Sequence, residues 1–249
     1  SLSWGARART HTFTSRLTAE PAETIAMQRR GLTILSLLIL LPLSAERARA
    51  QQFDIGSGGL PTITGARGGS VTGSADVTQS LVVNVDFGEL SPVNTSNLVV
   101  VTVPVSVRST SPYQVSVTLS GNFAADPQAV QRTDIGFGAL NLRSLGAKAR
   151  NCNGSPHLFR APFNNHPATA VTLDAQGRAA YPSTLANLGA SAVILSGPEL
   201  TKGNSVTRRE EDNGYVFDAV LVIKPQFYSS GRFNATLTFQ ISAGPNVQC

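Results

Sequence analysis

The sequence is poor in the residues that build most catalytic and metal sites. Its 249 residues include three histidines, two cysteines, one tryptophan and one methionine, and charged residues make up 14% of the chain. Beyond residue 50 the histidines are His157 and His166, and their spacing from Cys152, C-x4-H-x8-H, matches no common zinc pattern and offers no fourth ligand. No G-x-S-x-G nucleophile elbow is present, and neither histidine neighbourhood is distinctive of a Ser-His-Asp triad. These absences argue against an enzyme, a metal site and a cofactor.

The sequence gives little support for phosphate binding, glycoside hydrolysis or nucleic-acid binding. The glycine-rich stretch GSGGLPTITGARGG, residues 56–69, lacks the preceding strand, the following helix and the Lys-Ser/Thr pair of a phosphate-binding loop. Paired carboxylates for glycoside hydrolysis are hard to place, because acidic residues such as Asp86 and Asp218 fall on the outward, solvated faces of expected strands. The basic residues are scattered without interleaved aromatics, so the stacking platform of a nucleic-acid-binding surface is missing.

Residues 27–50, MQRRGLTILSLLILLPLSAERARA, have the layout of a secretory signal peptide. The basic pair Arg29-Arg30 precedes an apolar run over residues 32–43, and a polar segment ends in an Ala-x-Ala cleavage motif. At about 1.5 Å per residue, a helix of this run falls short of the roughly 30 Å hydrocarbon core of a bilayer. We therefore expect cleavage between Ala50 and Gln51, export to the periplasm, cell surface or extracellular space, and no membrane anchor after cleavage.

This interpretation makes residues 1–26 a non-native upstream extension, because a signal peptide begins at or near its initiator Met, here Met27. It also changes the charge balance. Residues 1–50 hold 7 of the 20 basic and 3 of the 15 acidic residues, which leaves 13 basic against 12 acidic residues, a net charge of +1, for residues 51–249. A nearly neutral mature chain argues against nucleic acid as a partner, although the pI of the whole sequence is near 9.7.

Both cysteines, Cys152 and Cys249, lie in the expected mature segment. Because the export signal places them in an oxidising compartment, we predict a disulfide between them, with free or intermolecular thiols as the alternative. The bridge would close a loop of about one hundred residues and add roughly 2–4 kcal/mol of stability, mostly by restricting the unfolded chain.

A period of two dominates the mature chain and predicts half-buried β-strands. In residues 99–108 the valines at odd positions fall on one face, and Tyr113 begins a second such face over residues 113–119. Pro104 has no N–H for a sheet ladder, so we expect it at an edge or a bulge. The break at residues 109–112 predicts a turn, which makes the two strands a hairpin.

The same alternation returns near the C-terminus in residues 214–225 and 231–243, with the segment QFYSSG predicted as the turn of a second hairpin. Shorter strands are expected at residues 81–87, 135–142 and 192–195, and no window of comparable length shows a helical period. The sequence therefore predicts an all-β domain over residues 80–249, in which about seven antiparallel strands form a β-sandwich.

Two regions fall outside the expected sheets. Residues 51–79 are rich in Gly, Ser and Thr, which favours a flexible N-terminal arm. Residues 146–190 contain Cys152 and several prolines and form a long middle loop with room for a few short strands or turns. Loops of that length in a compact domain are usually functional or poorly ordered.

Four segments, in the same order along the chain, resemble spore-coat-U-like and related pilin-type secreted β-sandwich domains of bacteria. They are VDFGELSP (residues 85–92), with the pattern F-G-x-x-x-P, YQVSVTLSGNF (113–123), ILSGPELTKGN (194–204) and YSSGRFNATLTFQIS (228–242). Such domains often carry an early cysteine pair, which this sequence lacks.

The resemblance implies an immunoglobulin-like sandwich that serves as an exported structural subunit of a surface appendage or coat. Its partners would be further copies or related subunits, joined through strand edges by β-augmentation. The arm at residues 51–79 is in the right place to donate a strand, although its apolar residues form no sustained alternation. The alternative is a monomeric extracytoplasmic binding module for carbohydrate or an envelope component. That module should expose aromatics, whereas Tyr113, Phe217, Phe233 and Phe239 are all assigned inward.

Overall fold

The computed structural model describes residues 53–73, 79–93, 97–145, 157–169, 171–175, 178–200, 214–229 and 232–245. The expected upstream extension, the signal peptide with its Ala50–Gln51 cleavage site, and both Cys152 and Cys249 lie outside these residues. Within the described residues the helical structure is limited to two 3₁₀ turns, η1 (Arg132–Asp134) and η2 (Leu185–Leu188). The prediction of an all-β fold is confirmed.

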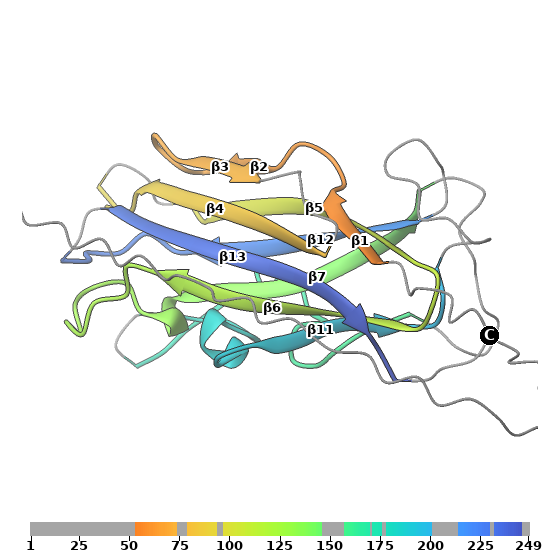
Figure 1. Ribbon diagram of the computed structural model, residues 1–249. Coiled ribbons are helices and arrows are strands. Elements are labelled where there is room, and N and C mark those ends of the chain that lie inside the picture. The colour runs from red at the N-terminus through yellow and green to blue at the C-terminus, as the bar shows by residue number, and fades with distance from the viewer. Residues whose placement is uncertain are drawn as a thin grey trace, which may run out of the picture. The chain divides into compact units, whose positions relative to one another are not determined.

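All described strands except the separate pair β9–β10 form two antiparallel sheets that pack against each other as the layers of a sandwich, with β4, β13, β6 and β11 in front and β5, β12 and β7 behind in Figure 1. Sheet A has the order β1-β5-β12-β7, and β2 also pairs with β5. Its strands are β1 (Phe53–Ser57), β2 (Thr62–Thr64), β5 (Val99–Ser109), β7 (Ile135–Ser144) and β12 (Tyr215–Ile223). Sheet B has the order β3-β4-β13-β6-β11-β8, with β3 (Ser70–Gly73), β4 (Ser80–Glu89), β6 (Tyr113–Gly121), β8 (Leu158–Phe159), β11 (Ala192–Gly197) and β13 (Arg232–Ala243).

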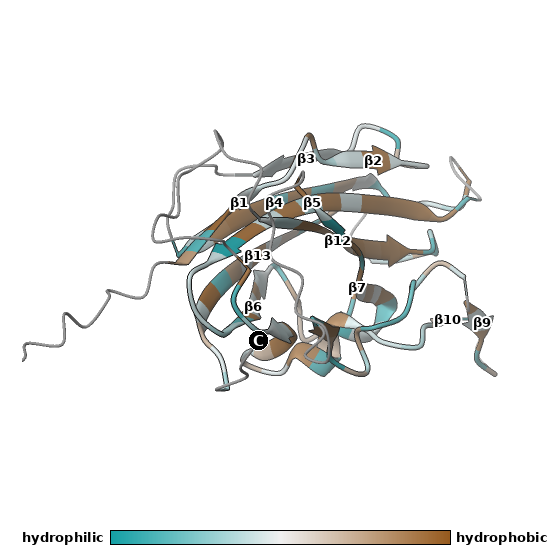
Figure 2. Cartoon of the chain, turned by 90° about the vertical axis from the view of Figure 1, so that its right-hand side faces the viewer, coloured by the Kyte–Doolittle hydropathy of each residue, from teal (hydrophilic) through white to brown (hydrophobic). Residues whose placement is uncertain are grey.

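The core between the sheets is built from the alternating faces that the sequence predicts. The valines at odd positions of β5 are at most 2% exposed, and the apolar faces of β12 and β13 are buried to a similar degree. Figure 2 shows the predominantly hydrophobic colouring of β5. At about 25 cal/mol per Å² of buried apolar surface, this shared interior is the main source of the stability of the fold.

The two predicted hairpins are wrong, because each turn carries the chain from one sheet to the other. β5 pairs with β12 in sheet A, whereas β6 pairs with β13 and β11 in sheet B. Likewise β12 belongs to sheet A and β13 to sheet B. Two consecutive strands that each have one apolar face can pair side by side or face each other across a core. Periodicity is identical in the two cases, and the four-residue break at residues 109–112 is not a two-residue hairpin turn.

The segment expected as a flexible arm is largely part of the sheets. β1 pairs with β5 over five residues, β2 pairs with β5 further along, and β3 pairs with β4. Ile55 of β1 enters the core and is 1% exposed. The glycines that suggested flexibility allow backbone segments to approach each other closely. Gly65 has a φ of +74°, and a side chain there would collide with the Leu98 carbonyl.

Pro104 occupies an interruption along one side of β5. β1 ends opposite Val105 and β2 begins opposite Thr102, so the β1–β2 turn lies beside the proline. The Pro104 carbonyl accepts a hydrogen bond of 2.8 Å from the Gly58 N–H on that same side. Because the N–H and C=O of one strand residue point the same way, the missing donor faces the turn and the ladder to β12 loses nothing.

The middle region contains the short elements that the sequence allowed for. Within its described part, β9 (Thr172–Leu173) pairs with β10 (Ala179–Ala180), and the region also contributes β8 and η2. It covers the outer edge of β7, where Phe137 N–H donates to the Ser183 carbonyl (3.0 Å) and Ala139 N–H to the Phe163 carbonyl (2.8 Å). Covering an edge in this way blocks further strand addition on that side.

The prediction of one polar face per strand fails for β12. Val216, Val220 and Val222, on its outer face, are at most 2% exposed. Val222 pairs with Gly136 of β7, and the rings of Tyr181 and Pro167 lie so close to Gly136 that they leave no space for a Cβ. The middle region therefore packs onto the outer face of sheet A.

Candidate functional site

An exposed aromatic lies at one end of the sandwich, in the loop that follows β12. Phe227 is 78% exposed, in contrast to the aromatics assigned inward from the sequence, which are all buried. The loop borders a pocket of about 350 Å³, lined by Pro92, Gln128, Arg178, Lys224, Pro225, Gln226, Phe227 and Tyr228. We name this the Phe227 pocket. Its volume is at the small end of the range for ligand-binding pockets.

The loop that carries Phe227 is tied to three other segments. Lys224 N–H donates to the Tyr181 hydroxyl (2.9 Å), and Gln226 N–H donates to the Leu90 carbonyl (3.0 Å). Ser229 N–H donates to the Gln128 carbonyl (2.9 Å), and its hydroxyl donates to Asp126 (2.6 Å). These bonds bracket Phe227 on both sides, so its ring is presented by a fixed backbone.

The pocket lining carries positive charge and no carboxylate. Its two cations are Arg178 and Lys224. Arg178 Nη2 donates to the Pro127 carbonyl (3.0 Å), and no ion pair joins Lys224 to a described residue. Burial raises the pKa of the Tyr228 phenol, with the nearby Asp134 adding to the effect, so this side chain stays neutral and acts as a hydrogen-bonding group at physiological pH.

A second, acidic hollow of about 290 Å³ lies on the other side of Arg178. Its lining includes Asp134, Asp174 and Tyr181. Burial is the main cause that raises the pKa of Asp134, opposed by a hydrogen bond from the Gln131 N–H (2.8 Å) and by the Arg178 charge. Burial also raises the pKa of Tyr181. No nucleophile paired with a general base is found among the described lining residues.

A groove separates the edge strand β3 from the β1–β2 turn. It has a volume of about 680 Å³ and is lined by Ser57, Gly58, Gly59, Leu60, Pro61, Val71, Thr72 and Gly73. Leu60 is 89% exposed at its mouth, and the Ser57 hydroxyl donates to the Gly59 carbonyl (2.5 Å) in the turn. Among the described residues β3 pairs with β4 alone. Its second edge therefore has no strand partner there, and residues of β3 line the groove.

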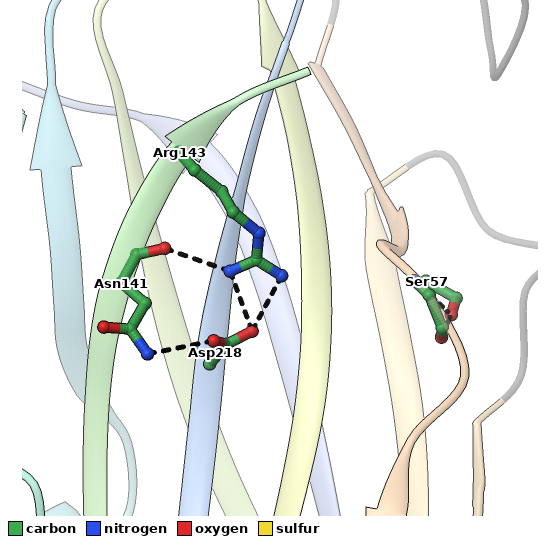
Figure 3. Close-up of polar contacts among 5 residues, drawn as sticks. Ser57, Asn141, Arg143 and Asp218 are labelled. Atoms are coloured by element: carbon green, nitrogen blue, oxygen red, sulfur yellow. Dashed lines mark hydrogen bonds and ion pairs between the residues drawn. The ribbon is translucent and has the colours of Figure 1, made fainter. Parts of the chain in front are cut away.

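A polar cluster lies on the outer face of sheet A, where the pairing of β7 and β12 shifts register (Figure 3). Arg143 Nη2 lies 3.0 Å from Asp218 Oδ1, and Asn141 Nδ2 donates to Asp218 Oδ2 (3.1 Å). Asn141 has a φ of +57°. The Asp218 side chain is only 13% exposed, so the expected solvated carboxylate is an internal anchor of a β-bulge.

The histidines considered as metal ligands have separate environments. His157 Nδ1 lies 3.2 Å from the Tyr113 hydroxyl, and its ring packs 5.0 Å from that of Tyr215. His166 Nδ1 accepts a hydrogen bond from the Ala168 N–H (3.1 Å). Cys152 lies outside the described residues. Within the part of the chain that the structure describes, no group of three or more His, Cys, Asp or Glu side chains is placed to hold a metal ion.

Comparison with known proteins identifies no relative, since no family model, no curated protein and no solved structure matches the chain. Over the described residues, no helix has the length and hydrophobicity needed to cross a bilayer. Sequence periodicity does not indicate the Phe227 pocket, because Phe227 falls in a segment that was predicted as a turn. The sequence feature that indicates an exposed ring is an aromatic residue between Pro225 and the segment Ser-Ser-Gly, outside any strand whose alternation would place it in the core.

Proposed function

We propose that the protein is an exported structural subunit of a bacterial surface appendage or coat, and that it assembles through β-strand edges. The observation that carries this proposal is the edge strand β3, whose sequence Ser-Val-Thr-Gly has neither a charge nor a proline. Natural sheets usually protect an exposed edge with a charge, a proline or a cover, as the middle region covers β7, or by a very short strand, and of these β3 has only its short length of four residues. The apolar groove beside β3, with the exposed Leu60, adds surface for an incoming strand.

The strand order supports the immunoglobulin-like part of the proposal. Sheet A, in the order β1-β5-β12-β7, matches the order A-B-E-D, and the neighbours β6 and β13 of sheet B take the places of C and F. β4 pairs directly with β13, from Gln240↔Ser80 to Arg232↔Glu89. No gap is left there for an inserted strand, so a partner strand has to add at an outer edge.

The test is the mass of the purified protein by size-exclusion chromatography with light scattering, together with negative-stain microscopy. We expect oligomers that grow with concentration, and their loss when Ser70→Lys and Thr72→Lys are combined, because charge on an edge strand opposes pairing. The matched control is Gln240→Lys, which adds charge at an exposed position of the central strand β13 and should leave assembly unchanged. A strictly monomeric protein without filaments would refute the proposal.

A monomeric extracytoplasmic binding module for carbohydrate or an envelope component is the second candidate, and the Phe227 pocket favours it. An exposed aromatic on a fixed loop, beside amide and cationic side chains, is the arrangement expected of a small ligand site. In this case light scattering gives a monomer at all concentrations, and a glycan array probed with the protein gives ligands that Phe227→Ala no longer binds.

A further inference from the structure

We propose that the Phe227 pocket binds a carboxylate-bearing sugar unit of an acidic polysaccharide. This inference rests on the binding-module candidate above and names its ligand class.

The first argument is the exposed ring. A buried aromatic contributes to the core, whereas Phe227 keeps 78% of its surface in solvent although hydrogen bonds hold its loop on both sides. Pro225, two residues before Phe227, further restricts the backbone of the loop. A flat apolar ring presented in this way suits the C–H face of a pyranose, which covers the ring without requiring a deep cavity. Rigid presentation also lowers the entropic cost of binding.

The second argument is charge. Arg178 and Lys224 both line the pocket and no carboxylate is among its lining residues, while Arg178 also faces the Asp134 carboxylate of the neighbouring hollow. Asp126 is close in sequence to Gln128, but it accepts the Ser229 hydroxyl (2.6 Å) and is not part of the lining. Two cations at one small pocket complement an anionic ligand. The Arg178 and Lys224 side chains can donate to the carboxylate of a sugar whose apolar face covers the exposed Phe227 ring.

The third argument is the remaining polar group. Gln128 is exposed, and its side-chain amide makes no hydrogen bond to a described residue, so it can donate to one sugar hydroxyl and accept from another. The Tyr228 phenol, held neutral by burial, donates to the Lys224 carbonyl (3.5 Å), and its oxygen can accept a hydrogen bond from a sugar hydroxyl. A phosphate ion would use the cations and leave the ring uncovered. An acidic peptide would pair with the cations but has no matching ring face in each residue.

The experiment is calorimetric titration of the purified protein with an oligogalacturonate and with its methyl-esterified form of equal length, which removes the charge and keeps the ring. We expect binding of the acid form that weakens as salt rises, and weaker binding of the ester by about tenfold or more. Phe227→Ala and Lys224→Gln should each weaken binding of the acid form by about tenfold. The matched control is Leu158→Ala, which truncates a partly exposed apolar side chain outside the pocket and should leave binding unchanged.

Each other outcome overturns the inference in a distinct way. Equal binding of the acid and its ester, lost in Phe227→Ala, would keep the binding module and refute recognition of the carboxylate. If poly-glutamate binds as tightly as the oligogalacturonate and Phe227→Ala does not weaken its binding, the pocket recognises negative charge alone and not a sugar. Absence of binding to every saccharide would refute both the inference and the binding module, and the light-scattering test of assembly would stand by itself.

Discussion

Asp54 and Arg108 stand directly opposite each other on β1 and β5, with Arg108 Nη1 3.6 Å from Asp54 Oδ2. Both side chains lie on the outer face of sheet A, yet they are only 10% and 6% exposed. The backbone of Gly214 lies against the Arg108 side chain and helps to exclude solvent. Because a buried charge requires its partner, this pair favours the register that places Asp54 against Arg108 and thereby docks the N-terminal strand.

Arg108→Gln should lower the free energy of unfolding by roughly 3–5 kcal/mol, because it removes the cation that faces a buried carboxylate. The matched control is Arg232→Gln, which breaks a 3.8 Å pair with Asp86 whose side chains are 63% and 32% exposed. Solvent screens that pair, so its loss should change the stability by no more than about 1 kcal/mol. Urea unfolding followed by circular dichroism measures both. Equal effects of the two substitutions would show that β1 is not docked as described.

Gly138→Ala should detach the middle region from sheet A. A Cβ at Gly138 would collide with the Asn165 carbonyl and lie 3.0 Å from the Pro167 ring, so backbone would have to move. Overpacking of this kind lowers stability by roughly 1–3 kcal/mol, and we expect faster proteolysis within residues 164–169. Gly56→Ala is the control, since its Cβ would meet the Ser106 hydroxyl at an ordinary 3.6 Å. Unchanged proteolysis in Gly138→Ala would contradict the packing described for this face.

Asp134 should make the protein less stable as the pH rises through the range above 3.8. Its pKa is raised in the folded state, mainly by burial, so the folded protein holds this proton more tightly than the unfolded chain. Stability therefore falls as the carboxyl ionises, and acid restores it. Asp134→Asn removes the titrating group while keeping an acceptor for the Gln131 N–H. The stability of the wild type relative to this variant should increase between pH 7 and pH 3 in urea titrations. If the stability of the wild type relative to Asp134→Asn decreases from pH 7 to pH 3, the pKa of Asp134 is lowered by folding and the prediction is wrong.

Sequence periodicity was sufficient wherever a strand has one polar and one apolar face. The inward valines of β5 and the aromatics at Tyr113 and Phe239 follow directly from it, because side chains alternate strictly along a strand. It failed for β12, whose outer valines were predicted to form a solvated face. Val220 and Val222 pair with glycines of β7 that the middle region covers, and Val216 lies against Gly58 of the β1–β2 turn. It also failed for residues 53–73, because frequent glycine suggests flexibility when the chain is taken alone, whereas here it permits close approach between strands.

The candidate sites depend still more on the tertiary structure. The Phe227 pocket joins residues near positions 92, 128, 178 and 224–228, and no local pattern connects segments so far apart in the chain. The polar cluster at Asp218 likewise draws Arg143 from another strand. Of the candidate histidines, His157 hydrogen-bonds to Tyr113 and packs against Tyr215, and its sequence neighbourhood does not indicate these contacts.

What the sequence by itself determined is the all-β class, the position of most long strands and the side of each that faces the core, since these follow from a local alternation of apolar and polar residues. What only the tertiary structure decided is which sheet each strand joins, which outer faces are covered and which aromatic stays in solvent. These choices depend on contacts between distant segments, and the gain from burying one apolar face against another is the same for many pairings until the whole chain is in place.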